Sequence, residues 1–384
     1  MIKRSFIRQL NSRFSEESPL IQVILGPRQV GKTTGTLQFL ESYDGPSHYC
    51  SADATLDNTG LWLEQQWQQA LEKGSSSLLV VDEIQKIANW SETIKKLWDS
   101  SRLKGNMKLL LLGSSSLVLQ KGLTESLTGR FEVISVPHWN YLESKEAFGY
   151  TLEEYLKYGG YPGARSFEND FDRWFAYVKN SIVDTVIGQD ILFQNPIRKP
   201  ALFKQAFAIL CGYPGQEVSY STLLGQLQDK GNTDLIKYYL ELFESAFLFA
   251  FLSKYSDKVV QSKTSSPKII HMCPAFYTLQ AGPRSLSDPA KFGHAFDSLV
   301  GADLCRSFPE RTFYWRNKNH EVDYVVKVFD EVYGIEVKSG KQGSVKGIGK
   351  LKDTYPYIKT VIVDRTNYET FATSPAAFLE QFAN

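Results

Sequence analysis

The feature that most constrains the fold is a glycine-rich segment that directly follows a short apolar run. Residues 20–25 read LIQVIL, which is the pattern of a buried strand, and residues 26–33 read GPRQVGKT, a full match to G-x-x-x-x-G-K-[ST]. We expect a helix to begin within this segment. In such a turn between a strand and a helix, successive backbone N–H groups and the helix N-terminus point at a phosphate group. The sequence therefore predicts a phosphate-binding loop in an α/β domain.

The residue types in this loop predict separate roles at a bound nucleotide. Lys32 is expected to reach the β- and γ-phosphates, and the hydroxyl of Thr33 is expected to bind Mg²⁺. ATP and Mg²⁺ are therefore the expected cofactors. The predicted nucleotide-binding residues are those of the loop and of the first helical turn: Gly26, Pro27, Arg28, Gln29, Val30, Gly31, Lys32, Thr33 and Thr34.

Further apolar runs predict the rest of a sheet. Residues 78–81 read LLVV, residues 109–112 read LLLL, and a last strand is expected at 133–136, just before Pro137. Helical patterns at 59–73 and 91–102 lie between these runs. Buried strands that alternate with helices favour a parallel sheet covered by helices on both faces.

Polar residues at the ends of these strands are the next candidates for the site. Asp82 and Glu83 follow the LLVV run, where one carboxylate is expected to bind Mg²⁺ and the other to polarise the attacking water. Ser114 follows the LLLL run, where it would sense the γ-phosphate or simply cap the strand. Arg130 precedes the last strand, where it would neutralise phosphoryl charge, in cis or from a neighbouring subunit, or form a structural ion pair.

Composition excludes several classes of protein. The chain has 384 residues, enough for two or three domains of roughly 150 residues each. Lys plus Arg is 43 and Asp plus Glu is 42, so the whole chain carries no polyanion-binding charge. The four cysteines form no CxxC pair, and the apolar runs are far shorter than the ~20 residues of a membrane-spanning helix. We expect a cytoplasmic protein with no membrane partner.

Several motifs in a fixed order resemble one protein family. The segments GPRQVGKT, VVDEIQ, LLLLGSSS and LTGRFEVISVPHW, followed by YGGYPGA at residues 158–164, resemble the AAA+-type ATPase domain of the prokaryotic AAA_14/DUF4143 proteins. The resemblance covers essentially the whole chain. It implies ATP hydrolysis with Mg²⁺, and it implies no defined biological role.

The middle of the chain carries a helix-turn-helix outline. A helix is expected at 220–227, a glycine turn at 230–232, and a second helix from about Thr233. This outline resembles the winged-helix module of the same family, whose second helix would read a DNA groove. Acidic residues outnumber basic ones along this segment, which favours packing or binding of a protein partner over direct DNA reading.

A second set of candidate site residues lies near the C-terminus. Asp323 begins one predicted strand, and Glu336 and Lys338 lie two residues apart on the next, so that these two share a face of a hairpin. This spacing resembles the PD-(D/E)xK nuclease fold. The resemblance implies that Asp323, Glu336 and Asp297 bind metal and that Lys338 positions or activates the nucleophile. The alternatives are an ion-paired hairpin and a binding fold that does not cleave. A run of lysines after Lys338 would contact phosphates or simply face solvent.

These expectations give an α/β chain of three parts. They are a P-loop AAA+-type core at 1–140, a helical and winged-helix-like segment at 141–260, and an α/β restriction-endonuclease-like domain at 268–384. The expected function is Mg²⁺-dependent ATP hydrolysis whose nucleotide state positions the nuclease-like domain on DNA or RNA. The alternative is a slow ATP switch, similar to the STAND-type signalling ATPases, with a C-terminal module that binds DNA or a protein partner. The oligomeric state stays open.

Overall fold

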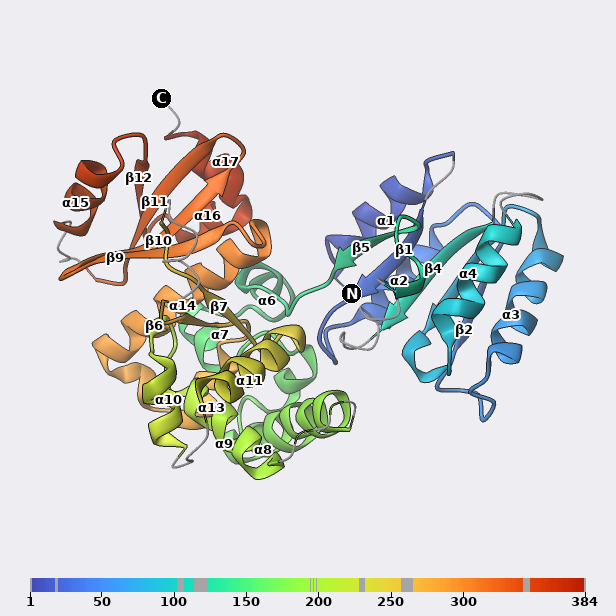
Figure 1. Ribbon diagram of the computed structural model, residues 1–384, viewed down its shortest axis with the longest axis horizontal. Coiled ribbons are helices and arrows are strands. Elements are labelled where there is room, and N and C mark those ends of the chain that lie inside the picture. The colour runs from blue at the N-terminus through green and yellow to red at the C-terminus, as the bar shows by residue number, and fades with distance from the viewer. Residues whose placement is uncertain are drawn as a thin grey trace. The chain divides into compact units, whose positions relative to one another are not determined.

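The computed structural model describes residues 2–17, 20–101, 107–113, 123, 125–193, 195, 197, 199–227, 232–256, 265–340 and 346–382. The chain forms two compact units, Met1–Pro137 and His138–Asn384. The first border therefore lies three residues before the expected one at 140. Figure 1 draws both units and labels most of their helices and strands.

A five-stranded parallel sheet forms the centre of the N-terminal unit. Its order is β2-β3-β4-β1-β5, and all four neighbouring pairs are parallel. Every residue of β1 and β3 is buried, because helices cover both faces. This confirms the parallel sheet expected from the apolar runs. The strands are β1 (Ile21–Leu25), β2 (Ser47–Ser51), β3 (Leu78–Asp82), β4 (Lys108–Gly113) and β5 (Phe131–Ser135).

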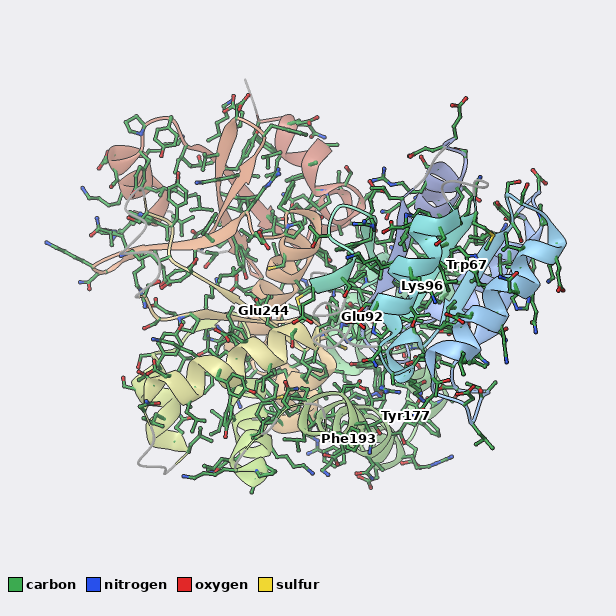
Figure 2. The ribbon with its side chains drawn as sticks, turned by 45° about the vertical axis from the view of Figure 1, so that its right-hand side comes forward. Trp67, Glu92, Lys96, Tyr177, Phe193 and Glu244 are labelled. Carbon is green, nitrogen blue, oxygen red and sulfur yellow. The ribbon has the colours of Figure 1, made fainter. Side chains whose placement is uncertain are left out.

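The helices of this unit fall on the two faces of the sheet. Figure 1 shows α3 and α4 side by side on one face, and α1 and α2 on the other. Trp67 of α3 is buried, and Lys96 of α4 forms an ion pair with Glu64 of α3 at 3.1 Å (Figure 2). The elements are α1 (Phe6–Phe14), α2 (Lys32–Glu41), α3 (Gly60–Lys73), η1 (Ile84–Lys86) and α4 (Trp90–Ser101).

The second unit begins with helices and a small sheet. The helical elements are α6 (Tyr141–Phe148), α7 (Leu152–Tyr158), η2 (Pro162–Phe167), α8 (Phe171–Ala176), the π-helices η3 (Tyr177–Val183) and η4 (Val186–Leu192), α9 (Pro200–Cys211), α10 (Tyr220–Gln226) and α11 (Thr233–Ser245). Three strands then form an antiparallel sheet of order β6-β8-β7. They are β6 (Gln216–Glu217), β7 (Phe249–Leu252) and β8 (Lys268–His271).

A four-stranded sheet of order β12-β11-β10-β9 completes the second unit. Strand β10 is antiparallel to both β9 and β11, whereas β11 and β12 are parallel. The pairing of β10 with β11 confirms the hairpin that the sequence predicts. The strands are β9 (Thr312–Asn317), β10 (His320–Val328), β11 (Glu331–Lys338) and β12 (Lys359–Asp364). The helical elements of this region are α13 (Ala275–Ala281), η5 (Ser285–Ser287), α14 (Pro289–Ser307), α15 (Lys346–Thr354), α16 (Tyr368–Thr373) and α17 (Pro375–Glu380).

One buried apolar cluster joins the start of the helical region to the four-stranded sheet. Tyr141 and Tyr155 from the helical region belong to the same buried cluster as Tyr324 and Ile335 of the four-stranded sheet. The described division of the chain lies between Pro137 and His138, and the expected border between 260 and 268 stays a prediction.

Across the described ranges, the structure has no helix that is both long and apolar enough to cross a membrane.

Candidate functional site

The phosphate loop joins β1 to α2 in the way that its sequence predicts. Gln29 and Gly31 have positive φ angles of 63° and 85°, so the backbone curls back before the helix begins at Lys32. A glycine is required at position 26 for a different reason. A Cβ atom there would lie 2.0 Å from the carbonyl oxygen of Val136, just after β5.

A Gly26→Ala substitution is therefore expected to displace the loop from β5. The overlap of the added methyl group with a backbone oxygen should lower the free energy of unfolding by about 1–3 kcal/mol and weaken nucleotide binding. Urea unfolding and calorimetric titration with ATP would measure both. Gly225→Ala is the control, because a Cβ there meets no described atom within 4 Å outside its own helix. Equal effects of the two substitutions would contradict this account.

The side chain of Lys32 lies inside the loop. It is 7% exposed, and its Nζ donates to the carbonyl oxygens of Gly26 at 2.9 Å and Pro27 at 2.7 Å. Buried Arg4 links the loop to the end of the N-terminal unit, because its guanidinium donates at 3.0 Å to the carbonyl oxygens of both Val30 and Pro137. No local sequence pattern indicates this role of Arg4, which precedes the first helix.

The second half of the site lies at the carboxyl end of β3. The hydroxyl of Thr33 donates to Oδ2 of Asp82 at 2.6 Å, and the hydroxyl of Tyr49 on β2 donates to the same oxygen at 3.0 Å. The other oxygen, Oδ1, accepts the backbone N–H of Glu83 at 2.9 Å. The structure thus brings the predicted Mg²⁺ ligands Thr33 and Asp82 together. A hydroxyl and a carboxylate are oxygen donors of the kind that Mg²⁺ prefers.

Two further residues, Glu83 and Ser114, were predicted to belong to this site. Glu83 has a left-handed backbone, with φ 53° and ψ 39°, and its carboxylate accepts a hydrogen bond from Gln85. Ser114 lies outside the described residues.

Arg130 does not lie at the phosphate loop. It precedes β5, and its guanidinium forms a bidentate ion pair with Asp99 of α4 at 2.8 and 3.0 Å. Because β5 is parallel to β1, Arg130 lies at the amino edge of the sheet, whereas the loop follows the carboxyl edge. Five residues of strand separate these edges by about 13 Å. The geometry therefore opposes the role in cis, and a role in trans stays a prediction.

The predicted C-terminal residues line one cavity of about 570 Å³. Asp323 lies where the pairing of β10 with β9 shifts, between Val322 and Val325, and irregularities of this kind redirect side chains. Its Oδ2 accepts the backbone N–H of Val337 at 2.8 Å, which fixes the carboxylate against β11. Lys338 and Glu336 form an ion pair at 2.7 Å, so they do share a face of the hairpin.

The cavity also holds a residue that sequence reasoning missed. Nζ of Lys268, on β8, lies 2.8 Å from Oδ2 of Asp297 and 3.8 Å from Oδ1 of Asp323. Burial alone would lower the pKa of Lys268, but Asp297 and Asp323 together raise it. Within the described ranges, no three His, Cys, Asp or Glu side chains are arranged to hold a metal ion. Asp297, Asp323 and Glu336 therefore line one cavity without forming a cluster of that kind.

Two of these carboxyl groups are strongly perturbed. Burial, with a smaller contribution from the neighbouring charge of Asp323, raises the pKa of Asp297 to about 7 and that of Glu336 to about 7. Lys268 opposes the shift at both groups, and Lys338 opposes it at Glu336. Oδ1 of Asp297 and Oε2 of Glu336 are buried without a hydrogen-bond partner among the described residues. Such oxygens are available to a cation or a donor that enters the cavity.

These shifts predict a pH-dependent stability. In the unfolded chain Asp297 loses its proton near its ordinary pKa of 3.8, whereas in the folded chain it keeps the proton up to about 7. Between these values the folded chain binds more protons, so the free energy of unfolding falls as the pH rises. From pH 5 to pH 8, Asp297→Asn should therefore gain on the order of 2 kcal/mol relative to the wild type.

Urea unfolding in EDTA at several pH values would measure this difference. Asp353→Asn, at an exposed carboxylate on α15, is the control and should follow the wild-type profile. If the free energy of unfolding changed equally with pH in Asp297→Asn and the wild type, the raised pKa assigned to Asp297 would be contradicted.

Comparison with known families agrees with the N-terminal site. The AAA domain family AAA_14 matches residues 18–145, and two domains of unknown function, DUF8612 and DUF4143, match residues 149–277 and 292–377. Together with the loop geometry, the first match supports an AAA-type P-loop ATPase domain in the N-terminal unit.

Similarity to individual proteins gives less information about function than the family matches do. An uncharacterized protein of Methanocaldococcus jannaschii is 27% identical over 332 residues, which cover 80% of this chain and 72% of that protein. The Holliday junction branch migration motor RuvB of Thermotoga maritima is 14% identical, with a TM-score of 0.35 over 65% of this chain and 89% of RuvB. The Aeropyrum pernix ORC1 protein in complex with DNA is 10% identical, with a TM-score of 0.30 over 72% of this chain and 91% of ORC1. Because both TM-scores lie below 0.5, no inference is drawn from these two likenesses.

Proposed function

We propose that the chain is a Mg²⁺-dependent ATPase whose nucleotide state controls a phosphodiester-cleaving site in the C-terminal cavity. The observation that carries the ATPase part is the meeting of the loop with the end of β3, where Lys32 lies inside the loop and Thr33 bonds Asp82 at 2.6 Å. Lys32 would move its ammonium from the loop carbonyls to the β- and γ-phosphates. Thr33 and Asp82 would hold Mg²⁺, which neutralises phosphate charge when it is bound.

Glu83 is the proposed partner of the attacking water. It directly follows Asp82 and is half-buried, with its carboxylate already held by Gln85. A carboxylate in this setting would accept a hydrogen bond from the water and orient it toward the γ-phosphate.

The cleavage part of the proposal rests on the C-terminal cavity. The helix α14 precedes the hairpin, as the likeness to PD-(D/E)xK nucleases implies, and it brings Asp297 to the same cavity as Asp323 and Glu336. Glu336 and Asp323 would hold a divalent cation, and the unpartnered Oε2 of Glu336 supports this role. Lys338, 2.7 Å from Glu336, would position or activate the water that attacks the phosphodiester.

The test couples the two sites. Single- and double-stranded DNA and RNA would be incubated with the protein and Mn²⁺ in the presence of ATP, ADP or a non-hydrolysable ATP analogue, while phosphate release is followed in parallel. We expect phosphate release that requires Mg²⁺ or Mn²⁺ and cleavage that differs between the nucleotides. Absence of phosphate release would reject the ATPase, and equal cleavage with all three nucleotides would reject the coupling.

A second candidate function is an ATP switch whose C-terminal part binds a partner without cleavage. One observation favours it: the surface of α11 in the winged-helix-like region is acidic, with Asp234, Glu241 and Glu244 against Lys237 (Figure 2 labels Glu244). An acidic helix repels the phosphates of a duplex and suits a basic protein partner. Duplex binding that weakens steeply with salt would favour the nuclease, and no binding at low salt would favour the switch.

A further inference from the structure

The cavity contains a buried cation that belongs to the chain itself. Lys268 is the first residue of β8, is 6% exposed, and points its ammonium at groups far away in the sequence. Its Nζ lies 2.8 Å from Oδ2 of Asp297, 3.2 Å from the carbonyl oxygen of Asp323 and 3.8 Å from Oδ1 of Asp323. The ring of Tyr324 covers it, with 4.2 Å between Nζ and the ring centroid.

These partners are the ones that a cation needs when it leaves water. Two carboxylates and a carbonyl supply oxygen atoms, and the aromatic face adds a further favourable interaction. Oxygen donors from carboxylates and carbonyls are also what Mg²⁺ or Mn²⁺ would bind at this place. The ammonium of Lys268 and a divalent ion therefore have the same partners and compete for one position.

Packing encloses Oδ2 of Asp297, the oxygen atom that Lys268 contacts. Gly215 has a positive φ of 68° and approaches Asp297 so closely that a Cβ atom there would lie 2.4 Å from its Oδ2. That oxygen is thus enclosed between Gly215 and Lys268. Asp323 keeps its Oδ2 on the backbone N–H of Val337, on the side of the hairpin that carries Glu336.

We propose that Lys268 is a positioning residue whose ammonium fills a cation position between Asp297 and Asp323 and keeps a divalent ion out of it. Asp297 is then the counter-ion of Lys268 and not a metal ligand. A single divalent ion remains for Asp323 and Glu336. This last consequence rests on the proposed function, whereas the filled position does not.

Counting bound Mn²⁺ tests the proposal directly. The parent protein carries Asp82→Asn, which removes the carboxylate of the N-terminal site, and is titrated at pH 8 without nucleotide while electron paramagnetic resonance reports free Mn²⁺. In this background, Lys268→Met and Lys268→Gln should each bind one Mn²⁺ more than the parent. Adding Asp297→Asn should remove the extra ion. A purely structural role of Lys268 would not change the number of ions, so an unchanged count in both variants overturns the proposal.

Failure of this proposal and failure of the proposed function give different results in this experiment. Removal of the charge of Lys268 leaves buried Asp297 uncompensated, so the methionine variant is at risk of unfolding. Glutamine retains a hydrogen-bond donor for Asp297, and circular dichroism would show that this variant is folded. An ion that the parent binds and that Asp323→Asn or Glu336→Gln removes supports metal-dependent cleavage. If the parent binds no ion but Lys268→Gln binds one, the filled position stands and metal-dependent cleavage is rejected.

Discussion

The Lys32→Ala variant is expected to lose ATP hydrolysis by a factor of about 10² or more, and to bind ATP much more weakly. The physical reason is the location of the ammonium group. It lies within the curl of the loop, in contact with the carbonyl oxygens of Gly26 and Pro27, and it belongs to the lysine that the motif places at the phosphates. Phosphate release and calorimetric titration with ATP would measure the two losses.

Two controls make this result specific. Lys95→Ala removes an exposed lysine on α4 and should leave both quantities unchanged. Thermal unfolding of Lys32→Ala would show whether the loop collapses when its carbonyls lose their donor. ATP turnover that survives in a folded Lys32→Ala protein would reject the assigned site, and with it the first half of the proposed function.

The second large effect is expected at the hairpin. Asp323→Asn and Glu336→Gln should each reduce Mn²⁺-dependent cleavage by about 10² or more, because each removes a negative oxygen from the cavity. Asparagine can still accept the backbone N–H of Val337 through its amide oxygen, so the hairpin should keep its structure. Gel assays of DNA and RNA cleavage would measure the change.

Asp330→Asn is the matched control for this prediction. Asp330 is exposed between β10 and β11, so the substitution removes the same charge from the same hairpin outside the cavity. Cleavage that depends equally on Asp330 and Asp323 would indicate a general charge effect. Cleavage unaffected by Asp323→Asn would reject the catalytic assignment.

Local pattern was sufficient to predict much of the fold and the first site. The glycine-rich turn after a buried strand determined the phosphate loop, since chirality and backbone hydrogen bonding leave that sequence few conformations. Two strand patterns joined by a short turn predicted β10 and β11, and the period of two placed Glu336 beside Lys338.

The other features of the fold and the sites depend on contacts between residues that lie far apart in the sequence. No local sequence pattern predicts such contacts. Strand β2 reads SHYCS, without the apolar run of its neighbours, and its pairing with β3 is what brings Tyr49 to Asp82. Lys268 precedes Asp323 by 55 residues, and only the arrangement of β8 beside the cavity brings the two together. Arg130 was placed correctly before a strand, but the direction of that strand decides which edge of the sheet it occupies.

The position of Lys268 on β8 has an electrostatic consequence for the cavity. Strand β8 pairs with β6 and β7, which come from the helix-rich stretch earlier in the chain, while the carboxylates belong to α14 and the hairpin. The positive charge that faces Asp297 is therefore held by a different sheet from the one that carries Asp323 and Glu336. The electrostatic potential at the acidic groups thus depends on how the small sheet packs against α14 and the hairpin.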